Sequence, residues 1–81
     1  MSGHKSLDTR SKLGRAVFSL VDQSHKSTPD NRGRVARIRN LVEASPDDAM
    51  IKFKINADLD VLAKDPRLSS TIMLLRKALP S

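Results

Sequence analysis

The sequence contains no cysteine, no tryptophan and no tyrosine, and phenylalanine occurs twice, as Phe18 and Phe53. Without cysteine there is neither a disulfide framework nor a thiolate metal site, and the absence is consistent with a reducing compartment. No aromatic ring stands among the clustered arginines, whereas most proteins that bind single-stranded nucleic acid stack the bases on such rings. Single-strand binding is therefore disfavoured.

Long apolar runs are also missing. The longest, residues 72–75, is far shorter than the ~18 apolar residues of a membrane span. The first residues, MSGHKSLDTRSK, lack the apolar segment of a secretory signal. We therefore expect a soluble, cytoplasmic protein that binds no membrane. Its 81 residues suffice for one small domain.

Side chains that carry catalysis or bind metals are scarce. The only histidines are His4 and His25, and no serine has a histidine and an orienting acid nearby in a known motif. Asp58 and Asp60 do not follow the spacing of a calcium loop. The three glycines are too far apart for a phosphate-binding loop. The sequence therefore predicts no enzyme, no catalytic residue, no metal site and no cofactor.

Proline marks the expected starts of helices. An oxygen-bearing side chain precedes a proline three times, in Thr28-Pro29-Asp30, Ser45-Pro46-Asp47 and Asp65-Pro66-Arg67. The first residue suits an N-cap, and proline fits the first helical position, where its missing N–H is not needed. Each motif predicts that a helix begins there.

Apolar residues recur at helical spacing in three segments, at about 9–26, 29–44 and 66–79. Ser6 or Asp8 is the expected cap of the first helix. The apolar positions are Leu13, Ala16, Val17, Leu20 and Val21 in the first segment, Val35, Ile38, Leu41 and Val42 in the second, and Leu68, Ile72, Leu75 and Leu79 in the third. In the last segment Met73, Leu74 and Ala78 widen the apolar face, which indicates a buried helix or one that needs a partner.

The segment between residues 46 and 65 is ambiguous. MIKFKI at 50–55 alternates as a strand does, yet Ile51, Ile55, Leu59 and Leu62 also fall on one helical stripe. Helix is favoured, because a lone strand has nothing to pair with. We predict an all-α fold: a bundle of three to four short helices in one domain at 9–79, after a flexible end at 1–8, with a short strand at 50–55 as the alternative.

The chain is strongly basic, with 15 lysines and arginines against 9 acidic residues, a net charge of +6 and a pI near 10.3. Such a balance attracts polyanions and acidic surfaces. Four arginines are concentrated in NRGRVARIRN at residues 31–40, namely Arg32, Arg34, Arg37 and Arg39. On a helical wheel they flank the apolar stripe on both sides.

Two interpretations of these arginines stay open. Their aliphatic stems can cover the margins of the core while the guanidinium groups remain hydrated. Alternatively, the two rows bind phosphates or carboxylates of a partner. The leading hypothesis is a regulatory protein that contacts duplex nucleic acid through these arginines, with support from Lys12 and Arg15.

The second hypothesis is an inhibitor or adaptor that binds protein. The same arginines would then surround an apolar interface with an acidic partner, and Met73, Leu74 and Leu75 would face that partner. A structural component of a ribonucleoprotein fits the charge equally well. Each hypothesis is also compatible with a homodimer.

One resemblance supports the second hypothesis. RVARIRNLV at 34–42, followed by KINADLDVLA at 54–63, resembles the C-terminal half of flagellar anti-sigma factors. In that family an amphipathic helix with a V-x-x-I-R pattern precedes a short K-[IV]-[DN] element and another helix. This chain differs by an insertion at 45–51 and by its basic N-terminal half. The resemblance implies a small helical inhibitor.

Overall fold

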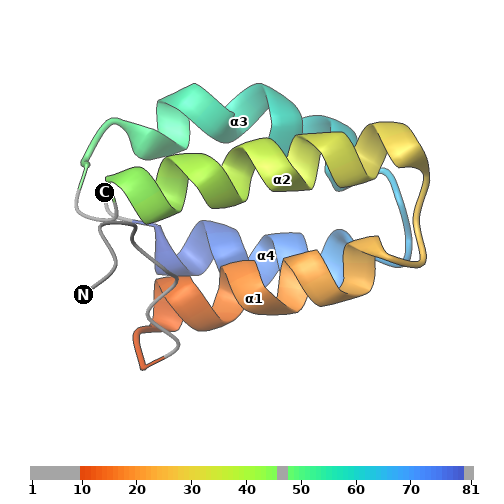
Figure 1. The fold of residues 1–81 in the computed structure, drawn as a ribbon, viewed down its shortest axis with the longest axis horizontal. Coiled ribbons are helices and arrows are strands. Elements are labelled where there is room, and N and C mark those ends of the chain that lie inside the picture. The colour runs from red at the N-terminus through yellow and green to blue at the C-terminus, as the bar shows by residue number, and fades with distance from the viewer. Residues whose placement is uncertain (1–9, 46–47, 80–81) are drawn as a thin grey trace, which may run out of the picture.

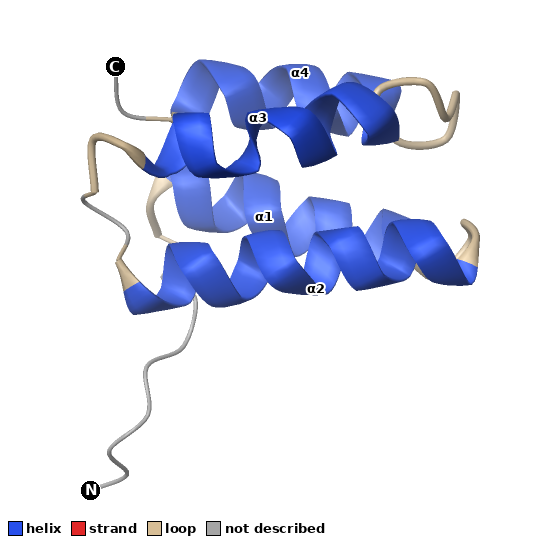
Figure 2. Cartoon of the chain, turned by 90° about the horizontal axis from the view of Figure 1, so that it is seen from above, coloured by secondary structure: helices blue, strands red, loops and turns tan. Residues whose placement is uncertain are grey.

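The computed structural model describes residues 10–45 and 48–79, which form four helices. These are α1 (Lys12–Ser24), α2 (Pro29–Ala44), α3 (Ile51–Leu62) and α4 (Ser69–Ala78). Each helix runs antiparallel to the one before it, and α4 returns to lie beside α1 (Figure 1). Seen from above, α1 and α2 form one layer and α3 and α4 the other (Figure 2). The predicted all-α bundle is confirmed.

The first two helices begin with side-chain caps. The Ser11 hydroxyl accepts a hydrogen bond from the Gly14 amide at 2.9 Å, and the Thr28 hydroxyl accepts one from the Asn31 amide at 3.2 Å. The predicted bounds of α2 are confirmed, with Pro29 at its first position. For α1 the cap is Ser11, whereas the expected Ser6 and Asp8 lie outside the described residues.

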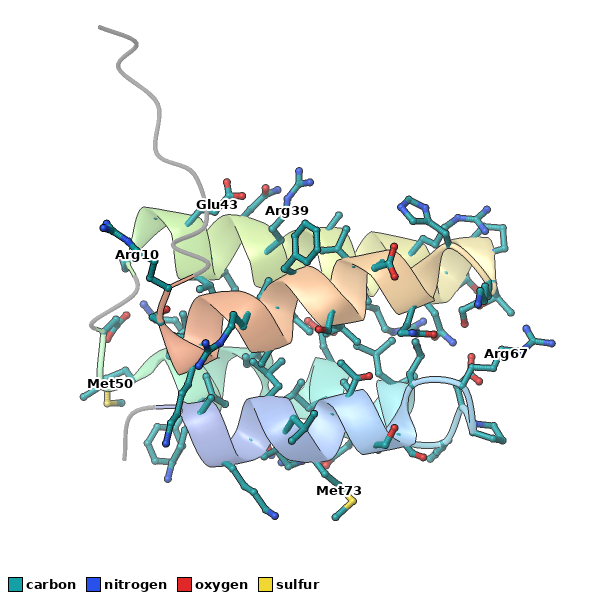
Figure 3. All side chains as sticks on the ribbon, turned by 90° about the horizontal axis from the view of Figure 1, so that it is seen from below. Arg10, Arg39, Glu43, Met50, Arg67 and Met73 are labelled. Atoms are coloured by element: carbon teal, nitrogen blue, oxygen red, sulfur yellow. The ribbon has the colours of Figure 1, made fainter. Side chains whose placement is uncertain are left out.

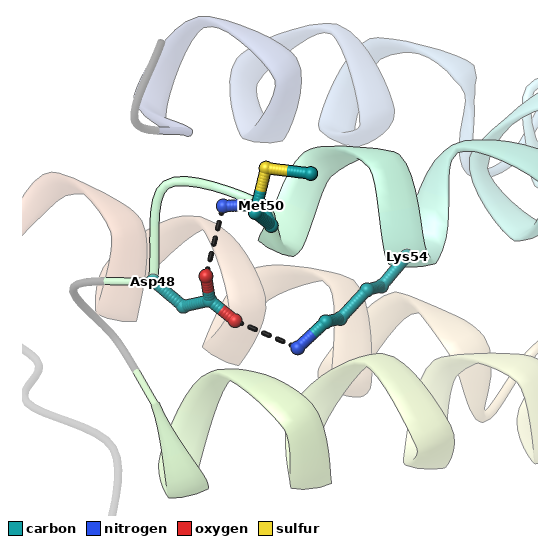
Figure 4. Close-up of polar contacts among 3 residues, drawn as sticks. All are labelled: Asp48, Met50 and Lys54. Carbon is teal, nitrogen blue, oxygen red and sulfur yellow. Dashed lines mark hydrogen bonds and ion pairs between the residues drawn. The ribbon is translucent and has the colours of Figure 1, made fainter.

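The start of α3 differs from the prediction. Ser45 ends α2, where its amide donates to the Leu41 carbonyl, and α3 begins only at Ile51. Asp48 organises the turn between them: its carboxylate accepts from the Met50 amide at 2.8 Å and pairs with Lys54 at 2.8 Å (Figure 4). Pro46 and Asp47 lie outside the described residues. The serine–proline rule failed here because the serine completes the preceding helix.

The sequence predicted that the fourth helix starts at Asp65-Pro66. A helical turn does begin there, but the regular helix α4 begins later, at Ser69. The Asp65 carbonyl accepts from the amides of Leu68 and Ser69 at 2.9 and 3.0 Å, so a helical turn precedes the regular helix. The Asp65 carboxylate accepts from the Arg67 amide at 2.9 Å, as a cap does. The regular helix then runs from Ser69.

Asp65 also joins the two connections at one end of the bundle. Its carboxylate accepts a hydrogen bond from the Ser27 hydroxyl. It accepts a longer one, at 3.4 Å, from the side-chain amide (Nδ2) of Asn31. The Arg67 guanidinium donates to the Lys26 carbonyl across the same gap. The α1–α2 and α3–α4 connections are therefore held together, which fixes the end of α1 against the start of α4.

The core follows the predicted stripes. Every helix contributes buried apolar side chains, which are Leu13, Ala16, Val17 and Leu20 from α1, Val35, Ile38 and Val42 from α2, Ile51, Ile55, Leu59 and Leu62 from α3, and Leu68, Ile72, Leu75 and Leu79 from α4 and its flanks. Val21 and Leu41, predicted on the same stripes, are half-buried at the core margin. Residues 51–55 lie within α3, so the strand alternative is not adopted.

Two sequence predictions outside the bundle itself concern membrane spans and the N-terminal segment. None of the four helices is long and apolar enough to cross a membrane, considering the residues that the structure describes. The segment 1–8, expected to be a flexible end, falls outside them.

Gly33 offers a simple test of the helix assignment. It lies exposed in the interior of α2, and a Cβ added there would meet nothing within 4 Å. Because glycine is about 1 kcal/mol less favourable than alanine inside a helix, Gly33→Ala should stabilise the fold by roughly that amount. Thermal unfolding followed by circular dichroism should show a rise of about 4–8 °C. An unchanged or lower midpoint would argue against a regular helix at this position.

Candidate partner-binding surfaces

The arginines of α2 contact acceptors of their own chain. Arg32 donates to the Ser27 carbonyl at 2.9 Å, and Arg34 makes a long contact, 3.5 Å, with the Asn31 side chain. The Arg32 contact holds the first turn of α2 against the α1–α2 connection, and the Arg34 contact lies within α2. The two arginines therefore have a structural role before any partner is considered.

Arg37 and Arg39 form ion pairs along the two edges of α2. Arg37 lies 3.5 Å from Asp58 of α3, although its side chain remains 67% exposed. Arg39 lies 3.6 Å from Glu43 one turn later (Figure 3). Its Nε is buried without a hydrogen bond. Surface pairs of this kind typically contribute less than about 1 kcal/mol. These contacts favour the interpretation in which the arginine stems cover the core margin.

The acidic part of the chain serves as the counterpart of the neighbouring cations. Besides Asp58, Asp60 of α3 pairs with Arg76 of α4 at 2.6 Å, and Asn56 accepts from the same guanidinium at 3.1 Å. The carboxylates of α3 therefore pair with arginines of both neighbouring helices, α2 and α4. On the opposite side of α4, the positive charge has no such counterpart in the part of the chain that the structure describes.

That unmatched charge lines a groove between α1 and α4. The α1/α4 groove has a volume of about 370 Å³ and is lined by Lys12, Arg15, Ala16, Ser19, Leu74, Lys77 and Ala78. Ala16 and Ala78 are too small to fill the space between the two helices, which opens the groove. Among the residues that the structure describes, no carboxylate lines it, and no hydrogen bond or ion pair holds the side chains of Lys12, Arg15 or Lys77.

The groove brings together three residues that the sequence singled out. Lys12 and Arg15 were predicted to bind nucleic acid or an acidic partner, and Leu74 was predicted to face a protein partner. Leu74 is 59% exposed at the groove wall. Lys77 was not predicted, although its position three residues after Leu74 places it on the same helical face.

The other two apolar candidates have different positions. Met73 is exposed and projects from α4 away from the bundle (Figure 3). Leu75 is fully buried in the core, so its predicted role in facing a partner is wrong. The broad apolar face of α4 is thus divided: one part closes the bundle, and Met73 and Leu74 remain outside it.

A second groove lies on the other side of α4. The α3/α4 groove has a volume of about 310 Å³ and is lined by Lys52, Phe53, Asn56, Leu59, Arg76 and Leu79. The side chain of Phe53 is 65% exposed. The Lys52 ammonium lies 5.5 Å from the centre of the Phe53 ring. Sequence reasoning missed this surface because Phe53 was read only as part of an alternating pattern.

Hydrogen bonds lower the pKa values of two carboxyl groups, Asp65 and Asp48. Hydrogen bonds from Ser27 and from the Arg67 amide lower the pKa of Asp65, and those from Lys54 and the Met50 amide lower the pKa of Asp48. Both carboxylates are structural. Among the described residues, no group of three or more histidine, aspartate or glutamate side chains could hold a metal ion.

Comparisons with protein families, with curated proteins and with solved structures found no match. What the two grooves bind is therefore inferred from their residues.

Proposed function

We propose that this protein is a small, non-enzymatic regulatory protein that binds an acidic amphipathic helix of a partner protein in its α1/α4 groove. The observation that carries the proposal is the position of Leu74 beside Lys12, Arg15 and Lys77, three cations for which the described part of the chain provides no acidic partner. An apolar anchor with a charged rim is the usual arrangement of a protein interface.

The shape of the groove supports a helix as the ligand. Two antiparallel helices with small side chains between them leave a channel parallel to their axes, into which a third helix can place its apolar stripe. Leu74, Ala16 and Ala78 would contact that stripe. Carboxylates at the edge of the stripe would reach Lys12, Arg15 and Lys77, which stand near the start of α1 and the end of α4.

Duplex nucleic acid, the leading hypothesis from sequence, has less support. A protein that binds phosphates through one helix needs guanidinium groups available to the duplex. Each arginine of α2 already contacts an acceptor of its own chain, and the Nε of Arg39 is buried. Nucleic-acid binding is therefore the alternative that the experiment must distinguish.

The proposal can be tested with a designed 18-residue helical peptide that carries a leucine stripe edged by glutamates. Fluorescence anisotropy would compare this peptide, a scrambled peptide of equal composition and a random-sequence DNA duplex at two salt concentrations. We expect the amphipathic peptide to bind and the scrambled peptide to bind more weakly. Lys12→Glu combined with Lys77→Glu should weaken peptide binding at least about tenfold.

A matched control is available in the same chain. Lys26→Glu combined with Lys64→Glu changes the net charge equally but lies in the connections at the opposite end of the bundle. This control should retain most of the affinity. The proposal is wrong if both double variants lose affinity equally. It is also wrong if the duplex alone binds, with a steep salt dependence that disappears when Arg32, Arg34, Arg37 and Arg39 are changed to glutamine.

A further inference from the structure

We infer that the α3/α4 groove is a self-association surface, in which two copies of this chain each insert Phe53 into the other's groove. This inference does not depend on the proposed function, because it concerns the opposite side of α4. The sequence suggested a homodimer without indicating its interface, and the inference names the surface through which the two copies meet.

The apolar character of this face is the first observation. Phe53 stands exposed at the wall of a groove that also contains Leu59 and Leu79, which belong to the core. Met50 is exposed three residues earlier, and its carbonyl accepts from the Phe53 amide at 3.0 Å. Met73 is also exposed on α4, one turn before Arg76, and Arg76 itself lines the groove. Large exposed apolar side chains that gather on one face mark an interaction site.

Charge is the observation that selects a second copy as the occupant. A chain of net charge +6 repels its own copies unless they meet where charge is balanced. Two cations line the α3/α4 groove, and one of them, Arg76, is paired with Asp60. Lys52 remains, and it lies over the Phe53 ring. The α1/α4 groove, by contrast, is lined by three cations that have no acidic partner among the described residues, and it would repel another copy.

The geometry also suits a two-fold contact. An isologous interface uses one surface twice, so it needs a protruding group and a complementary hollow on the same face. Phe53 is the protruding group, and the groove beside it is the hollow. The Phe53 ring of one copy would then contact Leu59 and Leu79 of the other. The Lys52 ammonium of each copy would lie near the incoming ring, where a cation–π contact is favourable.

The test is analytical ultracentrifugation of the full chain from low micromolar to near-millimolar concentration. A single small face gives a weak interface, so we expect a reversible dimer with a dissociation constant on the order of micromolar to tens of micromolar. Phe53→Asp should raise that constant at least about tenfold, because it places two carboxylates in apolar surroundings. Raised salt should leave the wild-type dimer intact or strengthen it.

Phe18→Asp is the matched control, because Phe18 is 58% exposed, nearly as much as Phe53, but lies on α1. We expect Phe18→Asp to dimerise like the wild type. A wild-type chain that stays monomeric at every concentration would overturn the inference, as would equal effects of the two aspartate variants. If Phe53→Asp lowers the helical content seen by circular dichroism, Met73→Asp provides the second variant, and an undiminished dimer would count against this surface. The Phe53→Asp monomer should still bind the acidic peptide, which separates this test from that of the α1/α4 groove.

Discussion

Ile38→Ala is expected to unfold a large fraction of the molecules at room temperature. Ile38 is completely buried on α2, in the core to which all four helices contribute. Truncation of a buried isoleucine to alanine costs about 2–5 kcal/mol, which combines lost transfer free energy with an unfilled cavity. A core of this size rarely supplies more than about 3–5 kcal/mol in total. No disulfide compensates for the loss, since the chain has no cysteine.

Urea unfolding followed by circular dichroism would measure this effect. We expect the midpoint for Ile38→Ala to fall to near zero denaturant, whereas Ile38→Val should lose only about 0.5–1.5 kcal/mol. Val61→Ala is the surface control, because Val61 is exposed on α3. Its free energy of unfolding should change by less than about 0.5 kcal/mol. Equal losses at Ile38 and Val61 would contradict the assigned core.

Asp65→Asn is expected to have the largest effect among polar substitutions. The Asp65 carboxylate accepts hydrogen bonds from Ser27, Asn31 and the Arg67 amide, and it thereby joins two connections. An asparagine amide has only one acceptor oxygen and no charge. The variant should therefore have a clearly lower melting temperature at pH 7, with the helical content of the folded state unchanged.

The same residue should dominate the acid sensitivity of the fold. Hydrogen bonds from Ser27 and from the Arg67 amide lower the pKa of Asp65 in the folded state. A lowered pKa stabilises the fold at every pH above the unfolded value of about 3.9, and this stabilisation disappears as the pH falls through the folded value. The melting temperatures of wild type and Asp65→Asn should therefore converge as the pH falls from about 5 towards 2.

Two further variants make this pH experiment specific. Asp22→Asn removes an exposed carboxylate of α1 for which no hydrogen bond or ion pair is seen in the described part of the chain, so its acid profile should match that of the wild type. The pKa of Asp48 is also lowered, by Lys54 and the Met50 amide, so Asp48→Asn combined with Asp65→Asn should flatten the profile further. A constant difference between wild type and Asp65→Asn at all pH values would show that the charge of Asp65 contributes nothing.

Helix positions and core residues were predictable from sequence because they depend on neighbours in the chain. Thr28 before Pro29 fixes the start of α2, and the spacing of Ile51, Ile55, Leu59 and Leu62 determines the buried face of α3. The start of α3 was not predictable from the same rule, because Ser45 can either end one helix or begin the next. The residues around Ser45 are compatible with either role, and the packing of α2 against α3 selects the one in which Ser45 ends α2.

The sequence by itself determined that this chain is basic, lacks cysteine and carries three amphipathic helical segments and a fourth segment of ambiguous pattern. Only the tertiary structure decided which cations have partners. Arg37 and Asp58 are 21 positions apart, and Lys12 and Lys77 are 65 apart, yet the antiparallel arrangement pairs the first two and leaves the second two at one groove. Charge interactions depend on distance in space, and the return of α4 to α1 sets that distance.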